Sequence, residues 1–353
     1  MWRPVSLRSG RINRSALGEL LELSRLFDKE LALRVAELGG RFPASAGHNM
    51  FLECELREAP TPAGFGLGFL PGTLDHYAVR NHWFPKSPTG RAIKVALSDD
   101  PFASDHAVYL NLLSDSDPDW IEYDIENRQI NLTPFVFFRL PSRYQTICTR
   151  EQARSLCETL PGGLANGEFA QILGALVDLA PVGMYRVGVA RQRGKVWWRA
   201  IITDLQEGQV STALSHQGAT DFSKTLEIAR KFYTGRADTP GACFALSIDI
   251  DDNRILAMDV ECPYLFRIKD VSVRKLAFQA MLAQLAEAGC ISTQMENWLA
   301  ECCCRDVVSR DSLRQLRVMV HHLKFRFLGF PHLRTKAYFH LEMTNRCNKD
   351  AVS

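Results

Sequence analysis

The hydrophobic and polar positions of this chain follow two rhythms. Over residues 15–38 the apolar residues recur at helical spacing, which predicts one amphipathic helix that ends at Gly39–Gly40. Ser15 is its expected N-cap, with Glu19 in the first turn. Residues 49–56 alternate instead, which predicts a strand with Leu52, Cys54 and Leu56 on one side and Asn49, Phe51, Glu53 and Glu55 on the other.

Later alternating runs come in pairs and predict β-hairpins. The pairs lie at 91–98 with 107–114, at 120–132 turning across Glu126–Asn127, at 184–205, at 243–262 and at 321–343. Helical spacing returns at 150–160, 166–179, 220–233, 271–304 with a break near Gly289, and 310–320. Residues 57–90 are rich in Gly, Pro and aromatic residues, so we expect a long loop, which in a compact domain usually carries function.

This order of elements predicts an α+β fold built from repeated helix–β-hairpin units. Consecutive hairpins joined by helices form an antiparallel sheet with helices on one side. The other face of such a sheet either lies in water or becomes the inside of a closed barrel with the helices outside. The 353 residues are expected to form one domain, with 1–145 and 146–353 as the halves into which it would divide.

Parity sorts the side chains of the last hairpin, because successive residues of a strand point to opposite faces. One face is mostly apolar and is expected to meet helices: His321, Leu323, Phe325, Phe327, Thr335, Ala337, Phe339 and Leu341. The other face is basic and carries a tyrosine: His322, Lys324, Arg326, Arg334, Lys336, Tyr338 and His340. Basic groups in a row hold an anion such as a diphosphate by charge-assisted hydrogen bonds.

The hairpin at 243–262 has an acidic face instead, with Asp249, Asp259 and Glu261. Separated carboxylates of this kind take a proton from a substrate. Glu53 and Glu55 lie on the polar face of the first strand, and Lys94, Arg186 and Arg199 add basic groups from other hairpins. The alternative explanation is a solvent-facing sheet whose charges only keep the protein soluble.

Composition narrows the class of protein. Hydrophobic residues make up 46% and charged residues 23%, as in ordinary globular proteins, and no apolar run is long enough for a membrane span. A formal net charge of +2 argues against a chain built to coat nucleic acid. The ten Cys contain no C-x-x-C pair and no secretory signal begins the chain, so we expect reduced Cys in the cytoplasm.

No metal site is predicted from the sequence. His321 and His322 fall on opposite faces by parity, and the pair of His322 and His340 lacks a third ligand. Residues 249–260 resemble a calcium loop, but Arg254 stands where that loop needs Gly, and Val260 where it needs Glu. The run "GFGLGF" has Gly at alternate positions without the helix or the GK[ST] that a phosphate-binding loop requires.

Two stretches carry a resemblance to a known family. "NMFLECELRE" is similar to the early strand of peptide-modifying enzymes from cyanobactin pathways, which bears a carboxylate after a first helix. "LRTKAYFHLEM" is similar to strands that pair Lys with Tyr in the wider family. Together with the repeated helix–hairpin units, these stretches resemble the ABBA-type (αββα) prenyltransferases.

The resemblance implies a closed antiparallel barrel with a solvent-filled interior and a ring of outer helices. It implies attack by an aromatic, hydroxyl or guanidine group of an aromatic or peptide acceptor on an allylic diphosphate. Lys324, Arg326, Lys336 and Tyr338 would hold the diphosphate, and Glu53 would be the base, with Asp259 and Glu261 behind it. No cofactor would be required, with Mg²⁺ the one metal left open.

A second hypothesis from a different class stays beside the enzyme. The polar sheet face would then bind a peptide or an anionic partner without chemistry, as an accessory protein in peptide modification. Three-dimensional placement separates the two: the enzyme needs the basic groups to converge with Glu53 or Glu261 across from them, away from bulk water.

Overall fold

The computed structural model describes residues 12–40, 42, 49–56, 60–68, 117–131, 135–139, 185–192, 195–216, 244–251, 254–262, 271–287, 289, 291–302, 305–311, 313–328 and 334–345. Strands make up most of this part of the chain. They are β1 (Met50–Leu56), β2 (Pro60–Gly68), β3 (Asp117–Glu126), β4 (Gln129–Ile130), β5 (Phe135–Arg139), β6 (Tyr185–Gln192), β7 (Lys195–Leu205), β8 (Phe244–Asp251), β9 (Arg254–Cys262), β10 (Arg305–Val308), β11 (Arg314–Leu328) and β12 (Arg334–Asn345).

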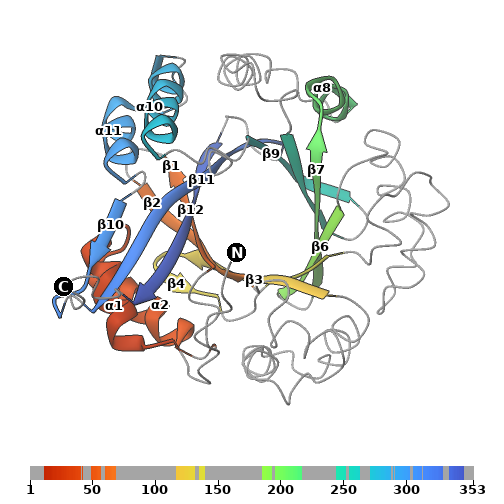
Figure 1. The fold of residues 1–353 in the computed structure, drawn as a ribbon. Helices are drawn as coiled ribbons and strands as arrows, with labels where there is room; N and C mark the ends of the chain where they lie inside the picture. Colours follow the sequence, from red (N-terminus) through yellow and green to blue (C-terminus); the bar gives the residue numbers. More distant parts are fainter. Residues whose placement is uncertain are drawn as a thin grey trace, which may run out of the picture.

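These strands form one antiparallel sheet that curls back on itself. The hydrogen-bonded order is β10-β11-β12-β1-β2-β3-β5-β6-β7-β8-β9, with β4 attached to β3. β9 also pairs with β11, which places Lys324 opposite Glu261 and Arg326 opposite Asp259. The last strand of the order therefore meets the second, and Figure 1 shows the resulting ring from one end.

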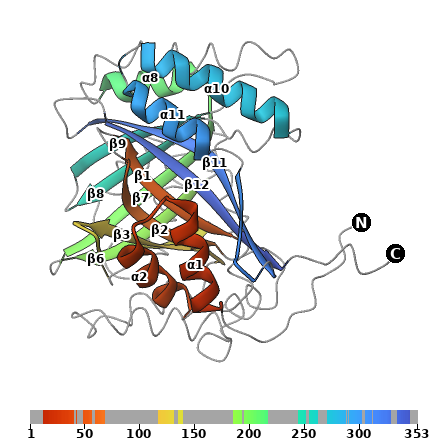
Figure 2. The ribbon, with the colours of Figure 1, turned by 90° about the vertical axis from the view of Figure 1, so that its left-hand side faces the viewer.

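The described helices lie on the outer side of this ring (Figure 1). They are α1 (Arg14–Ser24), α2 (Lys29–Gly39), α8 (Glu207–His216), α10 (Val271–Glu287) and α11 (Thr293–Cys302). Figure 2 shows α8, α10 and α11 gathered toward one end of the ring, with α1 and α2 closer to the other. None of the described helices is long and apolar enough to cross a membrane.

The main hydrophobic core fills the layer between the helices and the outer face of the sheet. Leu17 of α1, Phe278 of α10, Leu52 of β1 and Phe339 of β12 belong to this cluster, and all four are fully buried. The ring of Trp298 on α11 meets the ring of Phe339 edge-on, with centroids 5.7 Å apart. Burial of these apolar surfaces is the force that attaches the helices to the sheet.

A β-bulge in the middle of β11 keeps this core continuous. Val320 stands opposite Phe339, but the next register pair is His322 with Tyr338, so His321 is an extra residue. The side chains that face the core before the bulge have even numbers, such as Leu316, Val318 and Val320, and those after it have odd numbers, such as Leu323 and Phe325. Simple parity therefore fails across β11, the longest of the described strands.

The single helix predicted over 15–38 is wrong, because two helices occupy this region. The N-cap of α1 is Asn13 rather than Ser15, and the helix stops at Arg25, whose φ of 58° is left-handed. Asp28 then caps α2 by accepting a hydrogen bond from the backbone N–H three residues on, at 2.9 Å. A side chain that satisfies a free backbone N–H favours a new helix start over continuation. The predicted end at Gly39–Gly40 is confirmed.

The helix predicted over 310–320 is also wrong, since β11 begins at Arg314. Leu313, Leu316 and Val320 fit helical spacing, but Leu316, Val318 and Val320 fit strand alternation equally well. The three alternating residues are buried, whereas Leu313 is 59% exposed. Pairing with β12 along nearly the whole strand decides between the two patterns.

Residues 57–90 were expected to be a loop, and this is wrong for 60–68, which form β2. The rest of that stretch lies outside the described residues, as do the predicted hairpin at 91–98 and 107–114 and the predicted helices at 150–160, 166–179 and 220–233. Sequence patterns also gave no indication of β5, α8 and β10.

The strand at 49–56 and the hairpins at 120–132, 184–205, 243–262 and 321–343 are confirmed as β1, β3–β4, β6–β7, β8–β9 and β11–β12. The β3–β4 turn lies one residue later than predicted, at Asn127–Arg128, where both residues have positive φ as a tight type I′ turn requires. The break in 271–304 is confirmed near Gly289, whose φ is 72°.

Removing the Phe339 side chain tests the core between α11 and the sheet. Phe339→Ala is expected to lower the free energy of unfolding by about 3–5 kcal/mol, because a fully buried phenyl leaves a cavity. Denaturant unfolding measures the change. Leu276→Ala, at a residue 67% exposed on α10, should change the same quantity by less than about 0.5 kcal/mol. Equal effects in the two variants would contradict this placement of the core.

Candidate active site

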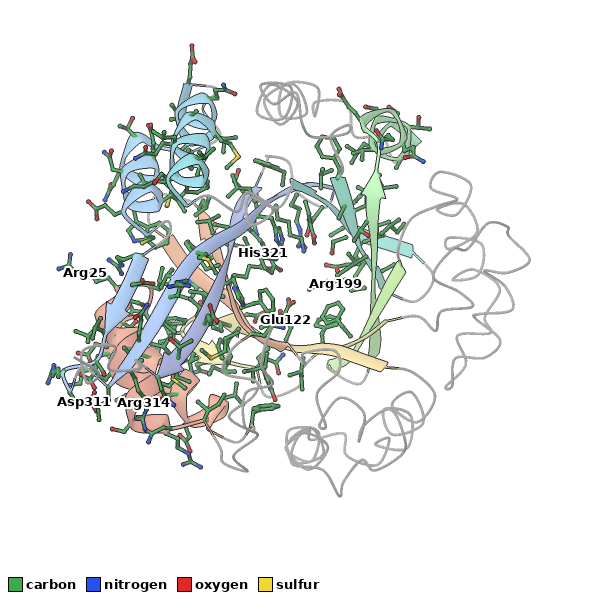
Figure 3. The ribbon with its side chains drawn as sticks, in the orientation of Figure 1. Arg25, Glu122, Arg199, Asp311, Arg314 and His321 are labelled. Atoms are coloured by element: carbon green, nitrogen blue, oxygen red, sulfur yellow. The ribbon has the colours of Figure 1, made fainter. Side chains whose placement is uncertain are left out.

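The inner face of the curled sheet carries ionisable side chains that are buried. Among the described residues, eight such groups come from β1, β3, β7, β8, β9 and β11: Glu53, Glu122, Arg199, Asp249, Asp259, Glu261, His322 and Lys324. Lys324 is only 2% exposed and Asp259 only 1%. Figure 3 shows Glu122, Arg199 and His321 within the ring, with Arg25, Asp311 and Arg314 at its outer side. A sheet face in bulk water would leave such groups exposed, so that alternative is wrong for the described residues.

The basic face of the last hairpin lies between two acidic strands. Within the hairpin, Lys324 stands opposite Lys336 and Arg326 opposite Arg334, and directly opposed like charges are destabilising. β9 and β1 flank the hairpin and compensate this repulsion with acidic residues: Glu261 opposite Lys324, Asp259 opposite Arg326, and Glu55 opposite Lys336. The ladder of cations is therefore neutralised from both sides.

On the β9 side, Asp259 receives two cations. Arg326 donates to it through two nitrogens, with Nε–Oδ1 at 2.5 Å and Nη2–Oδ2 at 2.9 Å. Lys324 Nζ lies 3.3 Å from Asp259 Oδ2 and 3.6 Å from Glu261 Oε1, and donates to Ser247 Oγ at 3.3 Å. Burial raises the pKa of Asp259, but Lys324 and Arg326 outweigh it and hold that pKa well below the usual range.

Arg199 of β7 links two further carboxylates across the ring. It donates to Asp249 through Nε at 2.6 Å and to Glu122 Oε1 through Nη1 at 3.0 Å. Its guanidinium also lies 4.6 Å from the centroid of the Phe135 ring, in a cation–π contact. Arg326 Nη2 reaches Asp249 as well, at 3.2 Å, so the Arg199 and Arg326 groups form one connected network.

On the β1 side, both oxygens of the Glu53 carboxylate accept hydrogen bonds. Lys336 Nζ donates to Oε1, and the Tyr338 hydroxyl donates to Oε2. Burial raises the pKa of Glu53, but Lys336 and then Lys324 outweigh it, so the pKa is lowered. At neutral pH Glu53 is therefore an ionised group engaged by its neighbours.

The bulge brings a third histidine to this face. His321 was expected on the apolar face, and this is wrong: its Nδ1 lies 2.7 Å from His322 Nδ1, and its ring contacts Phe51 and His340 at centroid distances of 5.6 and 6.5 Å. His322 stacks on the Tyr338 ring at 4.4 Å. Burial, opposed only in part by Glu261, lowers the pKa of His322 to about 4, so this imidazole is neutral at pH 7.

The expected site residues are partly gathered on this face. Glu53, Arg199, Asp259, Glu261, His322, Lys324, Arg326, Lys336 and Tyr338 belong to the network just described. Arg334 lies farther along, 3.6 Å from Glu55, and His340 packs beside Phe51 at 5.4 Å. In the register of β6 and β7, Arg186 stands opposite Ile201, and Gly188 stands opposite Arg199. The side chain of Arg186 lies outside the described part of the chain, and so does the whole of Lys94.

Two carboxylates of the network were not among the sequence candidates. Asp249 had been sorted to an acidic face, and its partner Arg199 lies directly opposite on β7. Glu122 was missed, although it alternates with the buried Ile121 and Tyr123 and so carries the same signal as Glu53. No group of described His, Cys, Asp and Glu residues has the arrangement of a metal site, the three histidines included.

No protein-family model matches this chain, and no curated protein matches its sequence. Solved structures do match its fold. The prenyltransferase PriB in its apo form superposes with a TM-score of 0.60 at 12% identity, over 93% of this chain and 94% of that one. The 6-dimethylallyltryptophan synthase from Micromonospora olivasterospora, in complex with DMASPP and Trp, gives 0.58 at 15% identity, over 93% and 95%.

AnaPT from Neosartorya fischeri matches over 95% of both chains, with a TM-score of 0.55 at 13% identity. The chain has the fold of the ABBA-type prenyltransferases. The resemblance seen in the sequence is thus confirmed for the fold, over nearly the whole chain. At this level of identity the shared property is the architecture, an antiparallel sheet curled into a barrel-like ring.

The neutral state of His322 predicts a pH-dependent contribution to stability. Its pKa lies near 4 in the fold and near 6.5 when unfolded, so the unfolded chain binds more protons between these values. Relative to His322→Gln, the wild-type free energy of unfolding should fall by about 1.4 kcal/mol per pH unit from pH 6.5 toward 4. Denaturant unfolding of both proteins at several pH values measures this difference. Parallel curves would refute a neutral buried His322.

Proposed function

We propose that this protein transfers a prenyl group from an allylic diphosphate to an aromatic acceptor, either a small molecule or a side chain of a peptide. The observation that carries the proposal is the row of Lys324, Arg326, Lys336 and Tyr338, which faces the inside of a ring with the prenyltransferase fold. Lys324 and Tyr338 are buried, and Arg326 and Lys336 are nearly so. The 6-dimethylallyltryptophan synthase of the same fold holds DMASPP and Trp together. The proposal includes a barrel closed along its length and surrounded by helices, which would keep water from the reacting groups.

In this proposal the four side chains bind the diphosphate. Lys324, Arg326 and Lys336 supply positive charge, and the Tyr338 hydroxyl donates to a phosphate oxygen. Each of them is bound to a carboxylate, so the diphosphate takes the place of Asp259 or Glu261 at Lys324 and Arg326, and of Glu53 at the Tyr338 hydroxyl. The ammonium of Lys336 has three N–H donors and binds Glu53 and the diphosphate together. Arg199 and Arg334 extend the same set of basic groups, and His322 and His340 border it; Lys94 and Arg186 stay predicted members of the set from the sequence.

The reaction needs protection of the allylic cation and removal of one proton. As the C–O bond to the diphosphate breaks, aromatic faces next to the donor stabilise the cation, and Tyr338 stacked on His322 is such a surface. The acceptor forms the new bond to the allylic carbon and then loses a proton to a carboxylate. Glu53 was the first candidate from the sequence for this proton acceptor, with Asp259 and Glu261 behind it.

One observation favours the second function, a protein that binds an anionic peptide without chemistry. The cations named above already have carboxylate partners, as in a face built for recognition of a charged segment. The two functions differ in whether an allylic diphosphate is bound and consumed.

Binding of dimethylallyl diphosphate tests the proposal directly. Isothermal calorimetry should show binding to the wild type, weakened roughly 10- to 100-fold by Lys336→Ala, because a charge-assisted hydrogen bond contributes about 1.5–3 kcal/mol. Lys275→Ala removes the same charge from an exposed site on α10 and should bind like the wild type. If the wild type gives no heat with either dimethylallyl or geranyl diphosphate, prenyl transfer is wrong and the binding function stands.

A metal requirement is tested separately. The proposal expects prenyl transfer to persist in excess EDTA, since Lys and Arg side chains supply the positive charge that a metal would otherwise bring to the diphosphate. Product formation is followed by mass spectrometry with and without added Mg²⁺. Loss of product in EDTA that Mg²⁺ restores would show that the cations of the sheet are insufficient.

A further inference from the structure

The glycines of β2 leave an inner-face gap between two carboxylates. In the register, Gly64 stands opposite Glu53 of β1, and Gly66 stands opposite Glu122 of β3. The residues that alternate with these glycines, Phe65 and Leu67, are fully buried. The repeated Gly of this strand thus removes side chains from the inner face at the position where β1 and β3 present their acids.

The two acids approach the same point in this gap. A methyl group placed on Gly64 would lie 3.4 Å from Cβ of Glu53 and 3.9 Å from Oε1 of Glu122. Both distances are ordinary van der Waals contacts, so nothing bulkier than the glycine separates the two side chains. Glu53 and Glu122 therefore act on each other electrostatically across the gap.

The surroundings of the two carboxylates differ. Glu53 accepts hydrogen bonds at both oxygens, from Lys336 and from Tyr338. For Glu122 the cation in contact is Arg199, which is itself divided between Glu122 and Asp249. A carboxylate whose two oxygens are both held by donors is a weaker base than one that shares its cation with a second acid.

The titration behaviour agrees with this difference. Burial raises the pKa of Glu122 to about 7; Glu53 and Asp124 add to the rise, whereas Arg199 and Lys324 oppose it. On the side of β5, the residue opposite Glu122 is Phe135, which brings no charge. A pair of acids whose surroundings push their pKa values apart is the arrangement in which one stays ionised and the other exchanges a proton near neutral pH.

We propose that Glu122 is the carboxylate that takes up and holds the proton released by the acceptor, while Glu53 stays ionised and keeps Lys336 in position. This inference rests on the proposed prenyl transfer. The acceptor forms a bond to the allylic carbon, the diphosphate leaves with the electron pair of the C–O bond, and the acceptor's proton passes to Glu122. The products are the prenylated acceptor, diphosphate and a neutral Glu122 carboxyl, which returns its proton to water.

The test is the pH dependence of kcat/KM for prenyl transfer. In the wild type kcat/KM should fall about tenfold per pH unit below pH 7, as Glu122 becomes protonated and loses its function as a base. Glu122→Gln should lower kcat/KM roughly 100-fold or more and remove this acidic limb. The amide still accepts a hydrogen bond from Arg199, so a purely structural role for Glu122 predicts an unchanged pH profile.

Two further variants keep the test informative. Glu122→Asp retains the carboxylate with a shorter reach, so the acidic limb should remain while kcat/KM drops by a smaller factor. Glu126→Gln makes the same chemical change at an exposed residue of the same strand and should match the wild type in both respects. Calorimetry with dimethylallyl diphosphate should give binding to all of these variants, because Glu122 is hydrogen-bonded to Arg199, which is not one of the four side chains proposed to bind the diphosphate.

The outcomes separate this inference from the proposed function. Transfer by Glu122→Gln with the wild-type pH profile would overturn the role of Glu122 and leave prenyl transfer standing. If the wild type binds the diphosphate and the acidic limb of the pH profile disappears in Glu53→Gln but not in Glu122→Gln, the proton passes to Glu53 instead. Absence of both diphosphate binding and transfer in the wild type would overturn the function and this inference together.

Discussion

The cost of removing charges from water governs this structure. Among the described residues, the inner face of the curled sheet buries two cations, Arg199 and Lys324, and five carboxyl groups, and an unpaired ion in such surroundings costs several kcal/mol. The strand order lowers this desolvation cost because it places strands of opposite charge side by side: the basic hairpin β11–β12 lies between acidic β1 and acidic β9. Neutralisation within the sheet is thus a condition for the ring to exist.

At the junction of β9 and β11, which closes the ring, the strand register and the placement of charge depend on each other. β9 meets β11 with Glu261 opposite Lys324 and Asp259 opposite Arg326. A slip of one residue would turn these groups toward the hydrophobic core and bring Val260 to the charged face. The ion pairs therefore act mainly as a specification of register, while the apolar residues of the outer face supply the stability.

Sequence patterns were sufficient for the elements that alternate or repeat cleanly. Hairpins such as 243–262, and the charges sorted by parity within them, came from local alternation alone. The errors arose where tertiary contacts decide: Asp28 divides the first helix, and β12 draws Leu316, Val318 and Val320 into a strand. The bulge at His321 was beyond prediction, because an extra residue leaves no mark in a sequence read by parity. Glu122 was missed because its partner Arg199 is 77 residues away.

The same neutralisation determines how the face would receive a diphosphate under the proposed function. Lys324 and Arg326 are already paired, so binding is an exchange of partners, in which phosphate oxygens replace those of Asp259 or Glu261. A displaced carboxylate stays buried and loses its cation. Burial without a neighbouring cation raises the pKa of a carboxyl group. Donor binding would therefore strengthen the bases of the site before any acceptor is deprotonated. The paired charges of the ring would thus couple binding of the prenyl donor to a higher carboxylate pKa, and so to proton transfer, without any change of fold.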